Sequence, residues 1–251
     1  MSTNDHKTEE NVSRRKFLKN TGVAAGGFVG GALLGGYFGN AFKTAPTKER
    51  EQERLPDKQY TEARMFFTRY EDFVVLEQAS ERIYPEDDHG PGAIELGVPY
   101  FIDKQLGGQW GLNARDYRQA PFVAGDASVD QSRLIRADIF INGIRQMNDL
   151  SQSEFDTSFD EADVDQQIII LEAFENDEVE MKSVSSASFF DLLRMSVIEG
   201  VYADPLYGGN RNMEGWRMRE YPGAVASYLD VIDSDEFVEM NPISLTDYQQ
   251  K

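Results

Sequence analysis

The chain has 251 residues, with 44 acidic and 25 basic side chains, a net charge of −19 and no cysteine. This balance argues against nucleic acid as a partner, because phosphate binding requires clustered lysine and arginine, and against an anionic membrane surface as a partner of the folded part. Without cysteine, the chain has no means of forming a disulfide, a thiolate zinc site, an iron–sulfur cluster or a covalent c-type haem.

The first element in chain order is an export signal. Six residues match the fixed positions of the twin-arginine pattern S-R-R-x-F-L-K: Ser13, Arg14, Arg15, Phe17, Leu18 and Lys19. An uncharged, glycine-rich stretch follows over residues 20–42, and a basic start before a weakly apolar segment is the plan of an export signal. The motif predicts export by the twin-arginine translocase, to the periplasm or the outer face of the cytoplasmic membrane.

Two interpretations of this leader, residues 1–45, stay open. Residues 21–42 are close to the roughly 20 residues that cross a bilayer, and no clean A-x-A cleavage site follows them. The leader is therefore either a cleaved signal or a retained membrane anchor. Residues 46–58 are polar and contain prolines, which predicts a tether to the domain formed by residues 59–251.

The domain is expected to be mainly α-helical, a single compact helical domain with a turn-rich C-terminal region after the signal or anchor helix. A long helix is predicted over 62–84, because apolar residues recur at helical spacing up to Pro85. A short helix is predicted over 98–106, which the following glycines would end. We find no alternating strand pairs joined by hairpin turns.

Three more helices are expected in the second half. The first runs from residue 128 or 129 to about residue 150. Asp160 is the expected N-cap of the next, and Ser188 of the last, which continues to Gly200.

Motifs that would assign an active site are absent from the sequence. It contains no G-x-G-x-x-G, no phosphate-binding loop and no G-x-S-x-G elbow. His89 is the only histidine after the leader, and no partner serine stands out. The acidic run Glu86, Asp87 and Asp88 lacks the alternate spacing of calcium ligands. The sequence therefore specifies no catalytic residue and no metal site.

The segment from 198 to 223 carries the most specific pattern. It resembles the signature of the gluconate 2-dehydrogenase subunit 3 family, the small subunit of membrane-bound flavin dehydrogenases. The matching residues are Glu199, Gly200, Asp204, Pro205, Tyr207, Gly208, Gly209, Asn210, Trp216, Tyr221, Pro222 and Gly223. The earlier stretch is also similar to that family, at Pro91, Gly92, Ala93, Val98, Tyr100, Ile102 and Asp103. The resemblance covers roughly residues 62–230.

The resemblance implies a division of labour. The large partner of the family binds FAD and oxidises a sugar or sugar acid, and a cytochrome c subunit often passes the electrons to quinone. The small subunit carries the export signal that the flavin subunit lacks, so that the two travel as one folded complex. The chain itself would then be non-catalytic and hold no cofactor of its own.

Part of this signature is expected to contact the large partner. The candidate interface residues are Pro91, Gly92, Tyr207, Gly208, Gly209, Asn210, Trp216, Tyr221, Pro222 and Gly223. The paired glycines permit positive φ, and the aromatic residues offer apolar area with polar tips, a type enriched at the centres of interfaces. The same aromatic loop could instead close the domain's own core, and both interpretations stay open.

Two functions of other classes also stay open. A stand-alone exported enzyme, such as a hydrolase, would use His89 or a pair of acidic residues. A membrane-tethered binding protein would have no redox partner.

The composition adds a hypothesis about the environment. Lysine is scarce after the leader, at Lys48, Lys58, Lys104, Lys182 and Lys251, and acidic residues dominate. An acid-rich, lysine-poor surface is typical of salt-adapted proteins.

Overall fold

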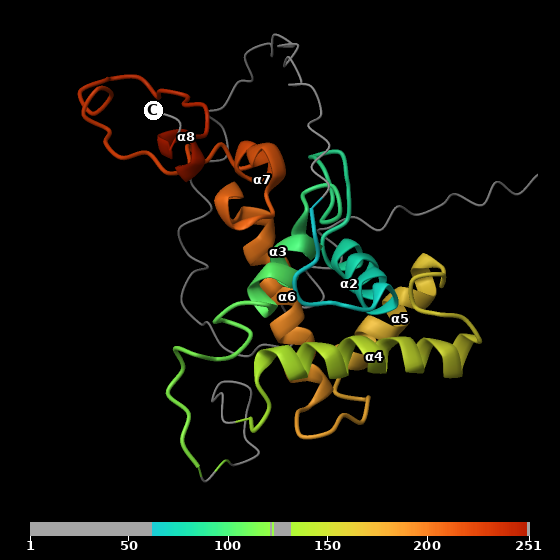
Figure 1. Cartoon of the computed structure of the whole chain (residues 1–251). Helices are drawn as coiled ribbons and strands as arrows, with labels where there is room; N and C mark the ends of the chain where they lie inside the picture. The colour runs from blue at the N-terminus through green and yellow to red at the C-terminus, as the bar shows by residue number, and fades with distance from the viewer. Residues whose placement is uncertain (1–61, 121, 123–131, 250–251) are drawn as a thin grey trace, which may run out of the picture. The chain divides into compact units, whose positions relative to one another are not determined.

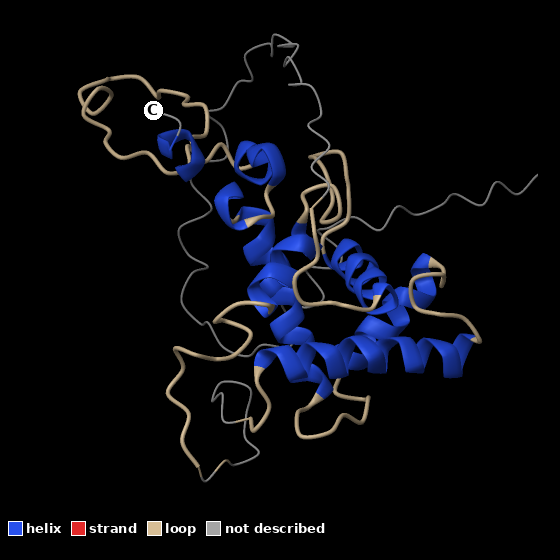
Figure 2. Cartoon of the chain, viewed as in Figure 1, coloured by secondary structure: helices blue, strands red, loops and turns tan. Residues whose placement is uncertain are grey.

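The computed structural model describes residues 62–120, 122 and 132–249, and every structural statement below concerns these residues. They form helices joined by loops, and the only β-type pairing among them is in isolated bridges (Figure 2). The predicted mainly helical, compact domain is confirmed. The export motif at Ser13–Lys19, the possible anchor at 21–42 and the tether at 46–58 lie outside the described residues. Within the described part, no helix has the length and apolar character needed to cross a membrane.

Seven α-helices and two short 3-10 helices occur in the described residues (Figure 1). The α-helices are α2 Tyr70–Ile83, α3 Val98–Leu106, α4 Arg136–Phe155, α5 Val164–Glu175, α6 Ser186–Tyr202, α7 Glu214–Arg217 and α8 Leu245–Gln249. The 3-10 helices are η1 Pro205–Tyr207 and η2 Arg211–Met213. The prediction of a helix over 98–106 is confirmed by α3.

Helix α6 is the centre of the packing, since it contacts α2, α3, α4, α5 and α7. Its Phe189 is fully buried. The ring lies edge-on to Phe140 of α4 at 5.8 Å and to Phe174 of α5 at 5.7 Å between centroids. Edge-to-face pairs at these distances add to the stabilisation from burial. This cluster fixes α6, whose last turns form the start of the signature segment.

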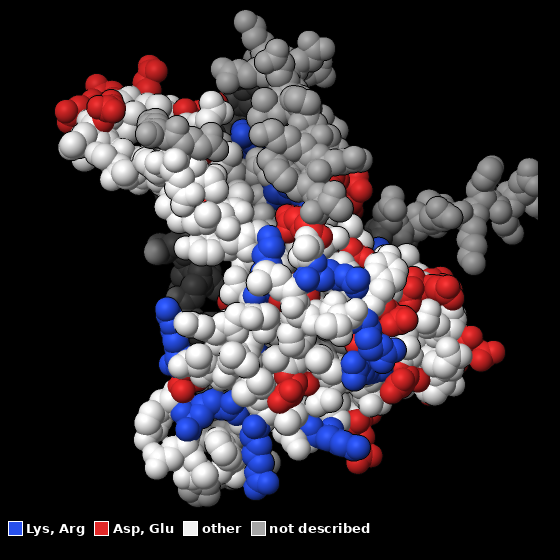
Figure 3. All heavy atoms as spheres, viewed as in Figure 1, with Lys and Arg blue, Asp and Glu red and all other residues white. Residues whose placement is uncertain are grey.

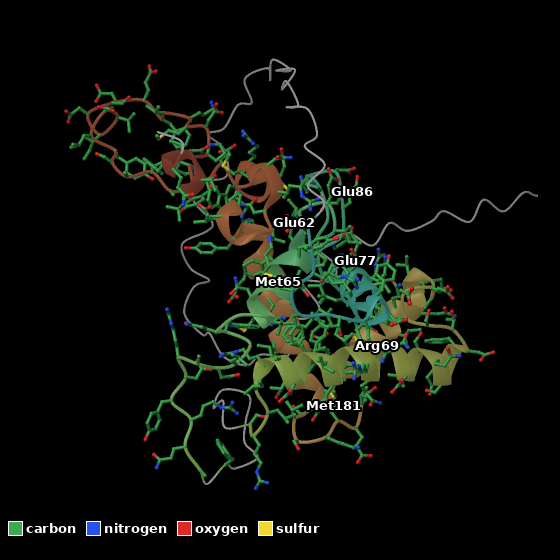
Figure 4. All side chains as sticks on the ribbon, viewed as in Figure 1. Glu62, Met65, Arg69, Glu77, Glu86 and Met181 are labelled. Atoms are coloured by element: carbon green, nitrogen blue, oxygen red, sulfur yellow. The ribbon has the colours of Figure 1, made fainter. Side chains whose placement is uncertain are left out.

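The start of α2 corrects the prediction of a helix from residue 62. The helix begins at Tyr70, and the segment before it is held by the fully buried carboxylate of Asp103 on α3. That carboxylate accepts hydrogen bonds from the backbone amides of Phe67 at 2.8 Å, Phe66 at 3.1 Å and Met65. Residues 62–69 are not helical, and Met65, which is labelled in Figure 4, lies in this segment. The domain therefore starts with a backbone clamp instead of a helical turn.

Helix α4 also begins later than predicted, at Arg136 instead of residue 128 or 129, and it runs to Phe155. Its first amide, on Arg136, donates to the side-chain oxygen of Asn113 at 2.7 Å. The next amide, on Ala137, donates to the carbonyl of Gly111 at 3.0 Å. The loop after α3 thus replaces a local cap, and a distant partner of this kind leaves no trace in the sequence next to the helix.

The caps of α5 and α6 lie three residues from the predicted ones. Asp163, and not Asp160, caps α5 in a capping box, accepting from the amide of Gln166 at 2.9 Å while the Gln166 side chain accepts from Asp163 at 3.1 Å. Ser185, and not Ser188, caps α6 by accepting from the Ser188 amide at 3.1 Å. In both segments several residues could serve as caps, and the side chain that accepts the N3 amide in the folded chain is the one that caps the helix.

Helices α2 and α4 are joined by an ion pair between a buried aspartate and an arginine whose side chain is 46% exposed. Asp72, on the buried side of α2, receives the guanidinium of Arg145 through Nε at 3.1 Å and Nη2 at 2.9 Å, both to Oδ2. The hydrogen bond to Asp72 raises the pKa of Arg145. If the helices moved apart, the Asp72 carboxylate would be left unpaired at a buried position, which is costly. The pair therefore holds α2 and α4 in register.

Candidate partner-binding surface

The signature segment starts in the last turns of α6 and continues into a tight turn. The Asp204 side chain accepts from the Leu206 amide at 2.9 Å and so caps η1. Gly208 and Gly209 follow with φ of 84° and 70°. A Cβ on Gly209 would lie 2.4 Å from the carbonyl oxygen of Gly200, so only glycine fits both the backbone conformation and the space. The turn brings the chain back against the end of α6.

Asn210 holds the far side of this turn from the inside. It is fully buried with φ of 41°, in the left-handed region. Its Nδ2 donates to the carbonyl of Ala203 at 2.8 Å, and its Oδ1 accepts from the amide of Gly215 at 2.8 Å. Both polar ends of the side chain are therefore satisfied by backbone, as a buried amide requires. Asn212 and Met213 also have positive φ. The backbone of this segment therefore takes a rarely populated conformation, which the hydrogen bonds of Asn210 hold in place.

Trp216 on α7 closes the domain's own core. Only 5% of its surface is exposed, and its indole N–H donates to the carbonyl of Tyr202 at 2.8 Å. Tyr221 lies edge-on to it, with 5.4 Å between ring centroids, yet 49% of Tyr221 is exposed. Tyr207 on η1 is 53% exposed. The aromatic residues of the signature therefore divide into a buried anchor and two exposed rings.

The earlier stretch that resembles the family lies against the same segment. The amide of Arg211 donates to the carbonyl of Leu96 at 3.0 Å, and its guanidinium donates to the carbonyl of Glu95 at 3.1 Å. The hydroxyl of Tyr84 lies 4.0 Å from the sulfur of Met218. Segments more than a hundred residues apart in the chain thus form one surface, through backbone contacts that hold them in a fixed register.

Glu81 organises the loop on that side. One oxygen of its carboxylate accepts from the amide of Glu86 at 3.1 Å and the other from the amide of Ile94 at 2.9 Å. A Cβ on Gly92 would lie 2.0 Å from this carboxylate, so a side chain at 92 would displace it. Glu86 is labelled in Figure 4.

The candidate interface residues fall into two groups by burial. Tyr207 and Tyr221 are exposed, and Pro91 and Pro222 are half-buried. The buried members are Gly92, Gly208, Gly209, Asn210, Trp216 and Gly223. Contact between the exposed residues and a partner stays a prediction. The buried residues fix the backbone that carries the exposed ones.

Sequence reasoning missed an exposed apolar region just after the signature. We call residues 225–242 the C-terminal arm. It includes Leu229, Ile232 and Phe237, which are 77%, 68% and 84% exposed. More than half of the exposed large hydrophobic side chains in the described residues lie after residue 205. In the sequence, the arm is recognisable as an apolar stretch whose spacing fits neither a helix nor a strand. Acidic residues interrupt this stretch, and it contains no lysine or arginine.

The residues considered for other chemistry do not converge. His89 is exposed, and its backbone amide donates to Asp87 at 2.8 Å. No group of three or more histidine, aspartate or glutamate side chains in the described part is arranged to hold a metal ion. Burial raises the pKa of Glu77 on α2, with Arg64 opposing it, and Glu77 is labelled in Figure 4. Burial also raises the pKa of Glu175 on α5, against Arg194 and with the help of Asp191 and Glu172.

Comparison with known proteins places the chain in a family. No curated protein and no solved structure matches the chain. A family model described as gluconate 2-dehydrogenase subunit 3 matches residues 70–223, from the start of α2 to the glycine that ends the signature. The chain therefore belongs to the gluconate 2-dehydrogenase subunit 3 family, whose name describes one subunit of a dehydrogenase complex.

Proposed function

We propose that the chain is a non-catalytic accessory subunit of an FAD-dependent sugar or sugar-acid dehydrogenase. In this proposal it binds the folded flavoprotein subunit, stabilises it and carries it through the twin-arginine pathway to the outer face of the cytoplasmic membrane. Family membership supports the place in a dehydrogenase complex.

The observation that carries the proposal is the construction of the signature surface. Its backbone is held by the buried side chains of Asn210 and Trp216, while Tyr207 and Tyr221 are left exposed above it. A rigid backbone that presents exposed aromatic rings loses little entropy on binding a protein. Such an arrangement suits a docking surface, since aromatic side chains are enriched among residues that dominate binding.

The leader supports the export part of the proposal. Arg14 and Arg15 lie in a motif that matches the twin-arginine pattern at each fixed position. A flavoprotein that folds around FAD in the cytoplasm needs a pathway that accepts folded cargo, and a bound partner with this signal supplies it. FAD would belong to the large subunit, and a cytochrome c subunit would complete electron transfer. Residues 21–42 would either be removed or keep the complex at the membrane.

The test is co-expression of this chain with the FAD-binding large subunit from the same source. Arg14→Lys together with Arg15→Lys should leave both proteins in the cytoplasm as a complex, while Lys16→Arg, a change of the adjacent residue that keeps its charge, should leave export intact. Flavin fluorescence of the fractions reports the large subunit. Export of the large subunit beside the double variant contradicts the carrier role. Failure of the two proteins to co-purify from the cytoplasm contradicts the complex itself.

A further inference from the structure

The C-terminal arm is fixed at its base and free of core contacts at its outer end. The amide of Ala224 donates to the carbonyl of Ile243 at 2.8 Å, and the amide of Ile243 donates to the carbonyl of Pro222 at 3.1 Å. The hydroxyl of Tyr248 on α8 donates to the carbonyl of Ala224 at 3.0 Å. The two ends of the arm are therefore pinned side by side, and Figure 1 shows the arm as an open loop beyond α7 and α8, away from α4 and α5.

The apolar residues of the arm do not serve the domain's own core. Leu229, Ile232 and Phe237 are among its most exposed side chains. A soluble domain rarely leaves large apolar side chains grouped in this way unless another molecule covers them. The arm continues from Tyr221 and shares its base with η1, which carries Tyr207 and contacts α8. It therefore extends the exposed part of the signature surface.

The charge of the arm restricts what can cover it. Residues 225–242 contain five acidic side chains, Asp230, Asp233, Asp235, Glu236 and Glu239, and no lysine or arginine. Figure 3 shows acidic side chains at the outer end of this segment. Anionic lipid headgroups attract basic segments and repel acidic ones. Two identical arms facing each other would also repel. The complementary surface is an apolar one bordered by lysine and arginine on a different protein.

We propose that the C-terminal arm is a second docking element, which lies against an apolar surface of the large dehydrogenase subunit bordered by basic residues. This inference rests on the proposed function, and it adds a contact outside residues 70–223, the part of the chain matched by the family model. Leu229, Ile232 and Phe237 enter the apolar surface of the partner. Asp233, Asp235 and Glu236 face its basic border and orient the approach.

The experiment measures binding of the purified, FAD-loaded large subunit to the full chain by titration calorimetry. Leu229→Ser with Ile232→Ser should raise Kd by about 10-fold or more, as expected for two apolar residues buried in an interface. The matched control is Ile169→Ser with Met195→Ser, which are 54% and 58% exposed on α5 and α6. The control should change Kd by less than about 3-fold. Thermal melting should show both variants folded, because all four side chains are exposed.

Two further variants test the role of the acidic side chains of the arm and show whether a single exposed substitution has the same effect as the double one. Phe237→Ser, a single change at an 84% exposed position, should weaken binding in the same direction. Replacing Asp233, Asp235 and Glu236 by their amides should slow association and reduce its dependence on salt.

The outcomes separate the inference from the function on which it rests. If the unmodified chain does not bind the large subunit, the proposed function fails and the inference fails with it. If the unmodified chain binds and the arm variants bind equally well, the inference alone is overturned. It is also overturned if the arm variants lose only binding to vesicles of phosphatidylglycerol and phosphatidylcholine, or only self-association measured by light scattering.

Discussion

The carboxylate of Asp204 accepts a hydrogen bond of 2.8 Å from the hydroxyl of Ser244, forty residues later in the chain. The same carboxylate accepts from the amide of Leu245 at 2.9 Å and from the amide of Leu206, which it caps. One side chain of the family signature therefore fixes both the start of η1 and the start of α8. The position of the C-terminal arm therefore depends on a residue just after α6.

Asp204→Ala should loosen the arm without unfolding the helices. Three hydrogen bonds to a charged acceptor are lost, and a cost of about 1–3 kcal/mol is expected because the groups are partly solvated. Hydrogen exchange of residues 225–249 should become faster, while α4 to α6 keep their protection. Asp230→Ala, an exposed aspartate within the arm, is the control. Unchanged exchange in the arm would show that the backbone hydrogen bonds of Ile243 with Pro222 and Ala224 are sufficient to hold it.

Trp216→Ala and Tyr207→Ala should separate fold from binding. Trp216 is 5% exposed and hydrogen-bonded, so truncation should cost about 3–5 kcal/mol of unfolding free energy. Tyr207 is 53% exposed, so its truncation should cost little stability and should weaken the complex with the large subunit. Chemical denaturation and calorimetry give the two quantities. Equal loss of stability in both variants would contradict the division into anchor and contact residues.

Asp103→Ala should destabilise the domain from its N-terminal end. The change leaves the amides of Met65, Phe66 and Phe67 without their acceptor, and a loss of about 2–3 kcal/mol is expected because part of this site is reached by water. Asp149→Ala, at an exposed position on α4, is the control. Urea unfolding measures the difference. The clamp would be unimportant if both variants unfolded at the same midpoint.

Glu175→Gln should stabilise the domain at neutral pH and not at acid pH. Burial raises the pKa of Glu175 in the folded state. Because the pKa of Glu175 is higher in the folded chain than the ordinary value of about 4.3, its protonation stabilises the folded state. This contribution is fully present below the ordinary pKa and is lost as the pH rises through the pKa of the folded state. The amide lacks the charge that burial disfavours, so a gain within about 1 kcal/mol is expected at pH 7. Melting at pH 4 and pH 7 checks it, and an equal effect at both would exclude the buried charge as its cause.

Salt should raise the melting temperature. With 44 acidic and 25 basic side chains, the chain repels itself at low ionic strength. Screening at molar salt reduces the Debye length to about 3 Å and removes most of this repulsion. A melting temperature that does not rise between low and molar salt would reject the hypothesis of salt adaptation.

The sequence was sufficient for the helical class and insufficient for most helix ends. The end of α3 could be predicted because Gly107 and Gly108 follow it directly. The starts of α2 and α4 could not be, because Asp103 and Asn113 act on them from elsewhere in the chain. At α5 and α6 neighbouring residues are equally suitable caps by sequence, and only the folded contact distinguishes Asp163 from Asp160 and Ser185 from Ser188.

For the candidate site, the sequence identified the segments and left the role of each residue open. The motif pointed to the stretch around Gly208 and Trp216, but burial could not be read from it, because aromatic residues occur both in cores and at interfaces. The structure places Trp216 inside and Tyr207 outside. The arm could not be predicted from the sequence, since its apolar residues follow no period that predicts a helix or a strand.

The clamp at Asp103 acts on chemical groups that almost every amino acid carries. Its partners are backbone amides, and the side chain of Met65 is 65% exposed. Any residue except proline supplies the same donor at position 65. Substitutions there should therefore leave the start of the described fold in place, so this end of the domain tolerates changes of side chain that a side-chain contact would not.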